Sequence, residues 1–441
     1  MKIPARPPAF TISPELVNRF DAVDLATDPY YPWERMQWRA APAGLTRQEW
    51  WSLTTLARRG SARHVPLRQI NGDRFWYSTP DEVLSALDRL APRAGGNVGV
   101  AEPITNSATR DRYLVRNLME EAITSSQLEG AATTRRVAQQ MLRSGRSPRT
   151  VGERMIWNNY QGMEFVRSHQ HDPITPDLVR ELHAVLTDGT LDVAADRGRL
   201  QTPDEQRVRI TTNDDDTTLH EPPSADELPR RLDELCEFAN SDDGPWTNPI
   251  LRAVLVHFMV GHDHYFVDGN GRLARTLFYW VMLQRGFWLT EFVTISTILR
   301  TAPVQYAHAY LNTEYEGDAT FFLIHQLDVL TKAFDDLDGY VDRTVRATRD
   351  LRRHLRSPDL ALNHRQLAIM ERALTDSSLD ITMQSHATSH RVSLMTARSD
   401  LMKLEELGLL ERHKEIRTNH WWPAPDIERR MNELRESPDR I

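Results

Sequence analysis

The sequence predicts a mainly α-helical protein with one small β-hairpin and a C-terminal winged helix-turn-helix. Three observations predict this fold class. Apolar residues recur at helical spacing through the middle of the chain. Residues 199–221 alternate between polar and apolar side chains and end at two prolines, as a hairpin does. Residues 352–430 read in order as helix, short strand, two helices and two alternating strands.

Length and composition are those of an ordinary globular protein. At 441 residues, two or three domains are expected, and the hydrophobic (40%) and charged (26%) fractions exclude a disordered or membrane class. The net charge of −8 argues against nonspecific adhesion to nucleic acid or membrane. Residues 1–17 lack a signal-peptide pattern, and the only cysteine, Cys236, cannot form an intramolecular disulfide. We therefore expect a cytoplasmic protein with no membrane partner.

Changes in composition divide the chain into three parts. Residues 1–95 mix tryptophan, proline and charged residues and predict an N-terminal helical region with a brief extended piece at 73–77. A glycine-rich break at 94–97 precedes a long helical middle, which we assign to 96–345. The winged helix-turn-helix is assigned to 352–430.

Several local signals place the elements of the middle part. Apolar residues at helical spacing from Asp111 onward predict a helix that runs to Gly130. Thr175-Pro176 and Asn248-Pro249 each pair a capping residue with proline at the first helical position, so each predicts the start of a helix.

The most informative stretch, 262–275, joins two apolar helices. In its segment Asp268-Gly269-Asn270-Gly271, two glycines allow unusual backbone angles, so that successive N–H groups can point the same way at the start of the second helix. Such an arrangement binds anions.

The charged side chains around this segment indicate what the anion is. Arg272 and Arg275, three residues apart, project from one side of the helix, which is unfavourable unless a multiply charged anion such as a polyphosphate binds there. Asp268 offers one oxygen ligand for a Mg²⁺ that is held mostly by phosphates and water. His264 carries the side chain best suited to accept a proton near neutral pH.

This stretch resembles the motif of the Fic family at every defining position. The matching residues are His264, Phe266, Asp268, Gly269, Asn270, Gly271, Arg272 and Arg275. Tyr265 departs from the proline of many members, and Tyr279 from an asparagine that several members carry, so no role is assigned to Tyr279. The resemblance covers about residues 100–345.

The resemblance implies a protein adenylyltransferase that moves AMP from Mg-ATP to a Ser, Thr or Tyr hydroxyl of a target protein. It implies that His264 deprotonates the hydroxyl, which attacks the α-phosphate of ATP and expels pyrophosphate. Asp268 would hold Mg²⁺, the amides of residues 269–271 and the two arginines would bind phosphates, and Phe266 would anchor the loop. The hairpin at 199–221 resembles the family's flap, which aligns a target segment by strand addition.

A second motif resembles the inhibitory segment of family members in which the inhibitory helix precedes the catalytic core. Ser125 and Glu129, in a helix near 111–130, are one helical turn apart. In the family the glutamate pairs with the second arginine, here Arg275, and withholds it from the γ-phosphate. The resemblance therefore implies autoinhibition by Glu129.

Each residue also has a simpler interpretation. His264 could be a structural histidine, and Glu129 an ordinary solvated carboxylate on a helix. His257, His262 and His264 crowd together, but their spacing fits no standard zinc site. The complete motif favours the catalytic interpretation.

The C-terminal part supports a different class of function, a DNA-binding transcriptional regulator. Its second long helix, 393–407, carries Arg398 and Lys403 but also three acidic residues, so the basic footprint is weak. Arg391, Arg412, Lys414 and Arg417 lie around the wing. We expect at most weak DNA binding, with protein binding or stabilisation of a homodimer as alternatives.

Overall fold

The computed structural model describes residues 3–22, 25, 27, 29–97, 107–211, 218–241, 246–355, 362–375, 379–415, 418–425, 427 and 429–430. The chain divides into two compact units. The first comprises Met1–Val100 and Leu114–Asp335, and the second comprises Ala101–Tyr113 and Asp336–Ile441. Each unit is described by itself.

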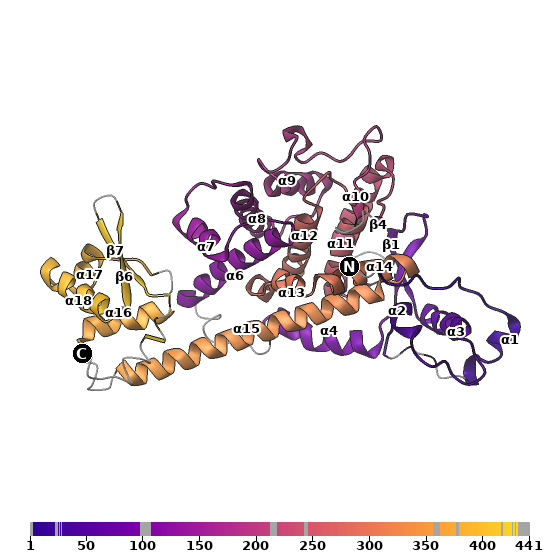
Figure 1. Ribbon diagram of the computed structural model, residues 1–441, viewed down its shortest axis with the longest axis horizontal. Coiled ribbons are helices and arrows are strands. Elements are labelled where there is room, and N and C mark those ends of the chain that lie inside the picture. The colour runs from indigo at the N-terminus through magenta and orange to yellow at the C-terminus, as the bar shows by residue number, and fades with distance from the viewer. Residues whose placement is uncertain are drawn as a thin grey trace. The chain divides into compact units, whose positions relative to one another are not determined.

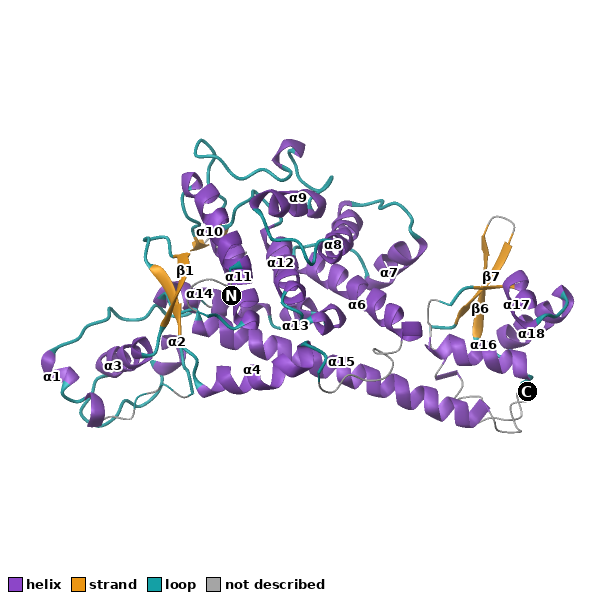
Figure 2. Cartoon of the chain, turned by 180° about the vertical axis from the view of Figure 1, so that it is seen from behind, coloured by secondary structure: helices purple, strands orange, loops and turns teal. Residues whose placement is uncertain are grey.

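Helices make up most of the first unit, as the sequence predicts (Figure 1, Figure 2). Two of its helices, α6 and α15, continue into residues of the second unit. The helices are α1 (Pro14–Val17), α2 (Trp33–Met36), α3 (Arg47–Gly60), α4 (Asp81–Ala94), α6 (Ser107–Leu128), α7 (Arg135–Ser144), α8 (Val151–Ser168), α9 (Pro176–Leu186), α10 (Leu228–Asn240), α11 (Pro249–Asp263), α12 (Asn270–Gln284), α13 (Ile295–Thr301), α14 (Pro303–Glu316) and α15 (Thr320–Leu355).

Helices α11 and α12 pack against each other and lie at the centre of this unit (Figure 1). Both helices are buried around nearly their whole circumference, which is typical of helices inside a core rather than on a surface. The predicted caps are present: Thr175 accepts a hydrogen bond from the Leu178 amide at the start of α9, and Asn248 accepts one from the Ile250 amide at the start of α11. The polar residues between α11 and α12 are therefore held by a rigid base.

Two short hairpins accompany the helices. In the N-terminal region, β1 (Arg63–Arg68) pairs antiparallel with β2 (Arg74–Tyr77). The extended piece at 73–77 was predicted, but β1 was missed because Pro66 interrupts its pattern. The second hairpin joins β3 (Ile210–Thr211) to β4 (Thr218–His220), within the predicted flap. The middle of the flap, residues 212–217, lies outside the described residues.

The second unit contains the elements predicted for a winged helix-turn-helix, in the predicted order. They are α16 (His364–Thr375), β5 (Ile381–Thr382), α17 (Met383–His390), α18 (Leu394–Glu406), β6 (Leu410–Glu415) and β7 (Thr418–Pro423). The three strands form one antiparallel sheet in the order β5-β7-β6. Met370, Leu401, Leu404 and Trp421 are buried together between helices and sheet.

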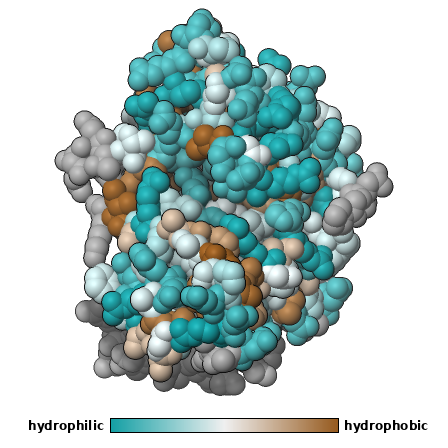
Figure 3. Space-filling model, turned by 90° about the vertical axis from the view of Figure 1, so that its right-hand side faces the viewer, coloured by the Kyte–Doolittle hydropathy of each residue, from teal (hydrophilic) through white to brown (hydrophobic). Residues whose placement is uncertain are grey.

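Hydrophilic residues cover most of the face shown in Figure 3, and hydrophobic residues appear on it as separate small patches. Across the described part of the chain, we find no helix with the length and apolar character needed to cross a membrane.

Candidate active site

The site is built on the turn between α11 and α12. His264 ends α11 in the left-handed conformation (φ 50°), which non-glycine residues adopt rarely. Gly269 begins α12 with φ 86°, where the missing Cβ removes the steric penalty. The turn thus reverses the chain within a few residues and directs His264 and the start of α12 toward the same region.

Two side chains of the motif hold this turn in place. The Asn270 side chain accepts a hydrogen bond from the Phe266 amide (3.0 Å) and donates one to the Phe266 carbonyl (2.7 Å), so it closes the loop on itself. Phe266 is fully buried, with its ring stacked 3.7 Å from the imidazole of His183. The Asn270 side chain is therefore occupied in structure, and only its backbone amide remains for a ligand.

His183, on α9, is a site residue that the sequence did not reveal. Its Nε2 donates to the Asp268 carbonyl (2.8 Å), and its Nδ1 accepts from the Gly198 amide (3.1 Å), which fixes one neutral tautomer. Burial, opposed by the hydrogen bond to Asp268, lowers the pKa of His183 to about 4. A histidine inside an amphipathic helix gives no local sign of such a role.

His264 has one ring nitrogen engaged by the protein. Its Nδ1 lies 3.3 Å from the Gly261 carbonyl, and because a carbonyl only accepts, this nitrogen carries the proton and Nε2 carries the lone pair. Burial is the main cause that lowers the pKa of His264 to about 4; the hydrogen bond to the Gly261 carbonyl opposes this shift, and the charges of His220 and Arg207 add to it. The neutral imidazole is thus a proton acceptor at pH 7.

Residues of the flap segment also hold the turn. Arg207 donates from Nη2 to the carbonyls of Asp263 (2.8 Å) and His264 (3.0 Å). His220 contacts the carbonyl of His262 through Nε2 (2.7 Å) and the carboxylate of Glu314 through Nδ1 (2.9 Å). Burial alone would lower the pKa of His220, but Glu314 outweighs it and the pKa is raised. The sequence did not connect either residue to the motif.

The start of α12 offers donors for an anion. The amides of residues 270–272 occupy the first turn, where no carbonyl of the same helix can accept from them. The Arg272 side chain is fully buried, and its Nη1 donates to the Leu186 carbonyl (2.8 Å). Its Nε and Nη2 are buried without a hydrogen-bond partner among the described residues. A buried guanidinium with two unused donors favours an anionic ligand.

The other arginine, Arg275, is fully engaged by the segment around α6. Its Nε donates to Ser125 Oγ (2.8 Å), and its Nη2 donates to the Ser125 carbonyl (3.1 Å) and to Glu129 Oε1 (2.8 Å). A Cβ atom placed on Gly271 would overlap Glu129 Oε1, so the carboxylate lies against the first turn of α12. The structure therefore brings Ser125 and Glu129 to the motif, as the resemblance implies.

Asp268 fits the requirement for a single metal ligand. Its Oδ1 accepts from the Gly269 amide (2.6 Å), while its Oδ2 lies 3.7 Å from Arg272 Nη2. The side chain is 58% exposed, so one oxygen faces solvent beside the donors for phosphate. One accessible carboxylate is the protein contribution that Mg²⁺ needs when phosphates and water supply the other ligands.

The remaining residues of the stretch have structural partners. His257 contacts the Tyr306 hydroxyl (2.7 Å), and His262 contacts the Asp263 carboxylate (3.1 Å). Within the described ranges, no cluster of three or more His, Cys, Asp or Glu side chains is arranged to hold a metal. The hydroxyl of Tyr279 bridges the Val293 carbonyl and the Ile295 amide.

The comparison with protein families shows what this site is similar to. The model of the Fic/DOC family matches residues 173–282, which span α9 to α12. The matched region contains the turn, the first helical turn of α12 and both arginines, but it leaves out the segment with Ser125 and Glu129.

Relatives with curated names are similar to part of this chain. Over 120 residues the chain is 30% identical to the protein adenylyltransferase fic-1 of Caenorhabditis elegans, a match that covers 27% of this chain and 21% of the relative. Over 104 residues it is 30% identical to the protein adenylyltransferase Fic of Nematostella vectensis, a match that covers 24% of this chain and 23% of the relative. The chain thus spans less than a quarter of the length of these relatives.

The structure of a Fic family protein from Desulfovibrio desulfuricans is similar over a larger part. It covers 78% of this chain and 97% of its own, with a TM-score of 0.50 and 17% sequence identity. At this identity the likeness shows the fold of the Fic domain and its surroundings, not their activity.

The buried imidazole of His183 predicts sensitivity to acid. Its pKa of about 4 lies below the ordinary value near 6.5, so between these pH values the unfolded chain binds a proton that the folded chain does not. This contribution to the free energy of unfolding is complete above pH 6.5 and is lost as the pH falls, by about 1 to 2 kcal/mol at pH 5. We expect His183→Phe, which retains the ring stack, to reduce this slope in urea unfolding at pH 7, 6 and 5. An unchanged slope would contradict the assignment.

Proposed function

We propose that this protein is a protein adenylyltransferase that transfers AMP from ATP to a Ser, Thr or Tyr hydroxyl of another protein. One observation carries the proposal. The N-terminus of α12 presents unused amides and the unpaired donors of Arg272 next to a neutral His264. This arrangement combines a polyphosphate site with a proton acceptor, which is what nucleotidyl transfer to a hydroxyl requires.

The names of the relatives support the same reaction. Both the Caenorhabditis and the Nematostella proteins are called protein adenylyltransferases, and each is 30% identical to this chain over a shared segment. Because the shared segment is a small part of each relative, the activity of this chain remains our proposal.

In the proposed reaction, His264 acts as the general base. Its Nε2 accepts the proton of the target hydroxyl, whose oxygen attacks the α-phosphorus of ATP, and the bond to the β-phosphate oxygen breaks to release pyrophosphate. A pKa of about 4 is low for a base at neutral pH. The negative charge of bound triphosphate favours the protonated imidazole, so nucleotide binding raises the pKa of His264 toward the working range.

The phosphates bind where the donors are available. The amides of residues 269–271 and the guanidinium of Arg272 hold the phosphate oxygens in this proposal, although the Gly269 amide must first leave Asp268 Oδ1. Mg²⁺, held by Asp268 and by the phosphates, would offset the negative charge of the triphosphate when bound. Arg275 would complete the site once it is free.

The target segment pairs with the flap in this proposal. The strands β3 and β4 leave backbone groups at the edge of a short hairpin, and an extended peptide can add to such an edge. Arg207 and His220 connect this hairpin directly to the backbone beside His264. A peptide on the flap would thus be placed relative to the catalytic base.

We further propose that Glu129 inhibits the enzyme. Its carboxylate binds Arg275 and lies against Gly271, so it occupies the position of an anion at the start of α12. To keep about 99% of the molecules inactive requires about 2.7 kcal/mol. A partly buried Arg–carboxylate pair with two further hydrogen bonds to Ser125 can supply an energy of this size.

The roles of the other parts also stay proposals. Residues 96–345 would form the transferase domain, residues 1–95 would support it, and residues 352–430 would form a winged helix-turn-helix. A homodimer through the C-terminal domain and a cytoplasmic location, which we expect from the single cysteine, belong to the same proposal.

DNA binding is a second candidate function, for the C-terminal domain alone. Asp400 on α18, which weakens the basic pattern in the sequence, is buried and accepts hydrogen bonds from Arg365 and Asn363. Arg398 on α18 is exposed, as is Arg391, which caps the end of α17 just before it. The exposed part of α18 is therefore more basic than the sequence indicates. Arg417, on the wing, lies outside the described residues.

The first test of the mechanism is His264→Ala. We expect labelled AMP transfer to a lysate protein to be lost while nucleotide still binds, because the proton acceptor disappears and the phosphate site remains. Asp268→Ala should instead raise the Mg²⁺ concentration that activity needs. Transfer by folded His264→Ala at the wild-type rate would disprove the assignment of the base.

The inhibitory role is tested by Glu129→Gly. Removal of the carboxylate frees Arg275 for the γ-phosphate, and we expect AMP incorporation to rise by up to about a hundredfold. Glu129→Gly with Arg275→Ala should lose this gain, because the freed arginine causes it. If Glu129→Gly is folded and incorporates no more AMP than wild type, autoinhibition by Glu129 is wrong.

DNA binding is tested by gel shift of the full chain at two salt concentrations. We expect weak binding that falls steeply as salt rises, since phosphate contacts would provide most of the affinity. Arg398→Ala should weaken it further. Tight, sequence-selective binding that persists at the higher salt would show that the regulator function is the stronger one.

A further inference from the structure

A buried polar cluster lies directly behind the catalytic turn, and the function proposed above does not use it. It consists of Arg231 on α10, Asp263 at the end of α11, and Tyr265. Arg231 and Asp263 are each only 2% exposed, and Tyr265 is fully buried. Asp263 and Tyr265 are the two chain neighbours of His264.

The carboxylate of Asp263 is saturated with donors. It accepts from Arg231 Nη1 (3.1 Å) and from the Tyr265 hydroxyl (2.8 Å), and it lies 3.1 Å from His262 Nδ1. The Tyr265 hydroxyl also lies 3.2 Å from the Arg231 carbonyl. Both side chains next to His264 are thus fixed to the same arginine.

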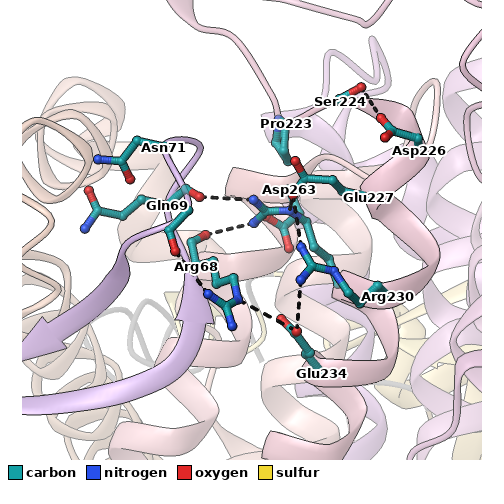
Figure 4. Close-up of polar contacts among 12 residues, drawn as sticks. Arg68, Gln69, Asn71, Pro223, Ser224, Asp226, Glu227, Arg230, Glu234 and Asp263 are labelled. Atoms are coloured by element: carbon teal, nitrogen blue, oxygen red, sulfur yellow. Dashed lines mark hydrogen bonds and ion pairs between the residues drawn. The ribbon is translucent and has the colours of Figure 1, made fainter.

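Arg231 also binds a distant part of the chain. It donates from Nη1 to the Arg68 carbonyl (2.8 Å) and from Nη2 to the Gln69 carbonyl (3.0 Å), at the end of β1. Its Nε donates to Glu227 (2.8 Å). Figure 4 shows the turn with Arg68 and Gln69, the Glu227 side chain and Asp263 converging from three segments of the chain.

The energetics indicate that this cluster does more than stabilise the fold. Moving two charges out of water costs several kcal/mol per ion, and the attraction between them often only offsets that cost, so a buried pair is weak support for stability. What such a pair provides is fixed geometry, because every nitrogen of the Arg231 guanidinium and both oxygens of Asp263 have a hydrogen-bond partner. Here the geometry concerns a histidine in the left-handed conformation.

We propose that Arg231 is a positioning residue for His264: through Asp263 and Tyr265 it fixes the catalytic turn and connects it to the β1–β2 hairpin of the N-terminal region. Tyr265 stands where many members of the family that the motif resembles carry a proline, whose ring restricts the backbone by itself. In this chain the hydrogen bonds of the buried cluster restrict the turn instead. The inference rests on the proposed transferase function.

The test compares Arg231→Met with Arg230→Met in the full-length Glu129→Gly background. Arg230 is a matched control because it is the next residue on α10 and its side chain is 55% exposed. Its ion-pair partners among the described residues are Glu227 and Glu234, both on or beside the same helix. We expect Arg231→Met to lower kcat for AMP transfer by about tenfold or more, and Arg230→Met to leave it unchanged. The Kd of a non-hydrolysable ATP analogue should change by less than about twofold, because the phosphate site is intact.

Conservative variants separate positioning from general destabilisation. Arg231→Lys retains the charge beside Asp263 but cannot reach both carbonyls, so it should recover part of kcat. A kcat of folded Arg231→Met equal to that of Arg230→Met would overturn the proposal. If Arg231→Met does not fold, Tyr265→Phe removes only the hydroxyl contact with Asp263. It should lower kcat at an unchanged Kd, and an unchanged kcat would also overturn the proposal.

Failure of the transferase function gives a different result. If the Glu129→Gly protein transfers no AMP, the proposed function is wrong, and hydrogen exchange of the amides of residues 261–268 decides the positioning role. Faster exchange in Arg231→Met than in Arg230→Met supports it, and equal exchange overturns it.

Discussion

Positive charge buried at the start of α12 is the constraint on which the rest of the site depends. Arg272 and Arg275 are almost fully inaccessible, and like charges at a helix N-terminus oppose the helix dipole. Burial lowers the pKa of Arg272, whereas for Arg275 the charge of Glu129 outweighs the burial and raises the pKa. Arg275 therefore has a close carboxylate partner, whereas Arg272 has only the longer ion pair with Asp268 and keeps two donors without a hydrogen bond among the described residues. That imbalance is the reason for proposing an anion at this site.

Because Arg272 and Arg275 repel each other, the turn between α11 and α12 needs contacts that hold it rigidly in place. Three side chains form this frame of contacts. His183 on α9 stacks on Phe266 and donates to the Asp268 carbonyl. Arg207 donates to the carbonyls at the end of α11, and Arg231 donates to the Asp263 carboxylate. These contacts are to backbone carbonyls, to Phe266 and to the chain neighbours of His264. The groups that we propose to react are therefore not used to hold the frame.

Features that depend on a few adjacent residues could mostly be predicted from the sequence. The helix starts at Thr175 and Asn248 depend on adjacent capping residues and prolines, so they could be predicted directly and are confirmed. The anion site was predicted from a contiguous run of glycine and arginine, and it stays a prediction. His183 and Arg231 could not be found in this way, because they act on the turn from other helices, and an isolated histidine or arginine in an amphipathic helix has no distinguishing pattern. The strand β1 was missed for a local reason, since its proline disguises an edge strand.

The helix α6, which ends just before Glu129, is also part of the core. The face of α6 that carries Ser125 holds Glu121 as well, which accepts from the Ser296 amide (3.2 Å), while Ser126 donates to the Met155 carbonyl (3.1 Å). Glu129 lies just past the end of the helix and is followed by Gly130 with φ 87°. Displacement of the whole helix would disrupt the core, whereas a rotation of the glutamate side chain or unwinding of the last turn would not. A local movement of Glu129 would therefore be enough for the release that we propose, and it would leave the folded core intact.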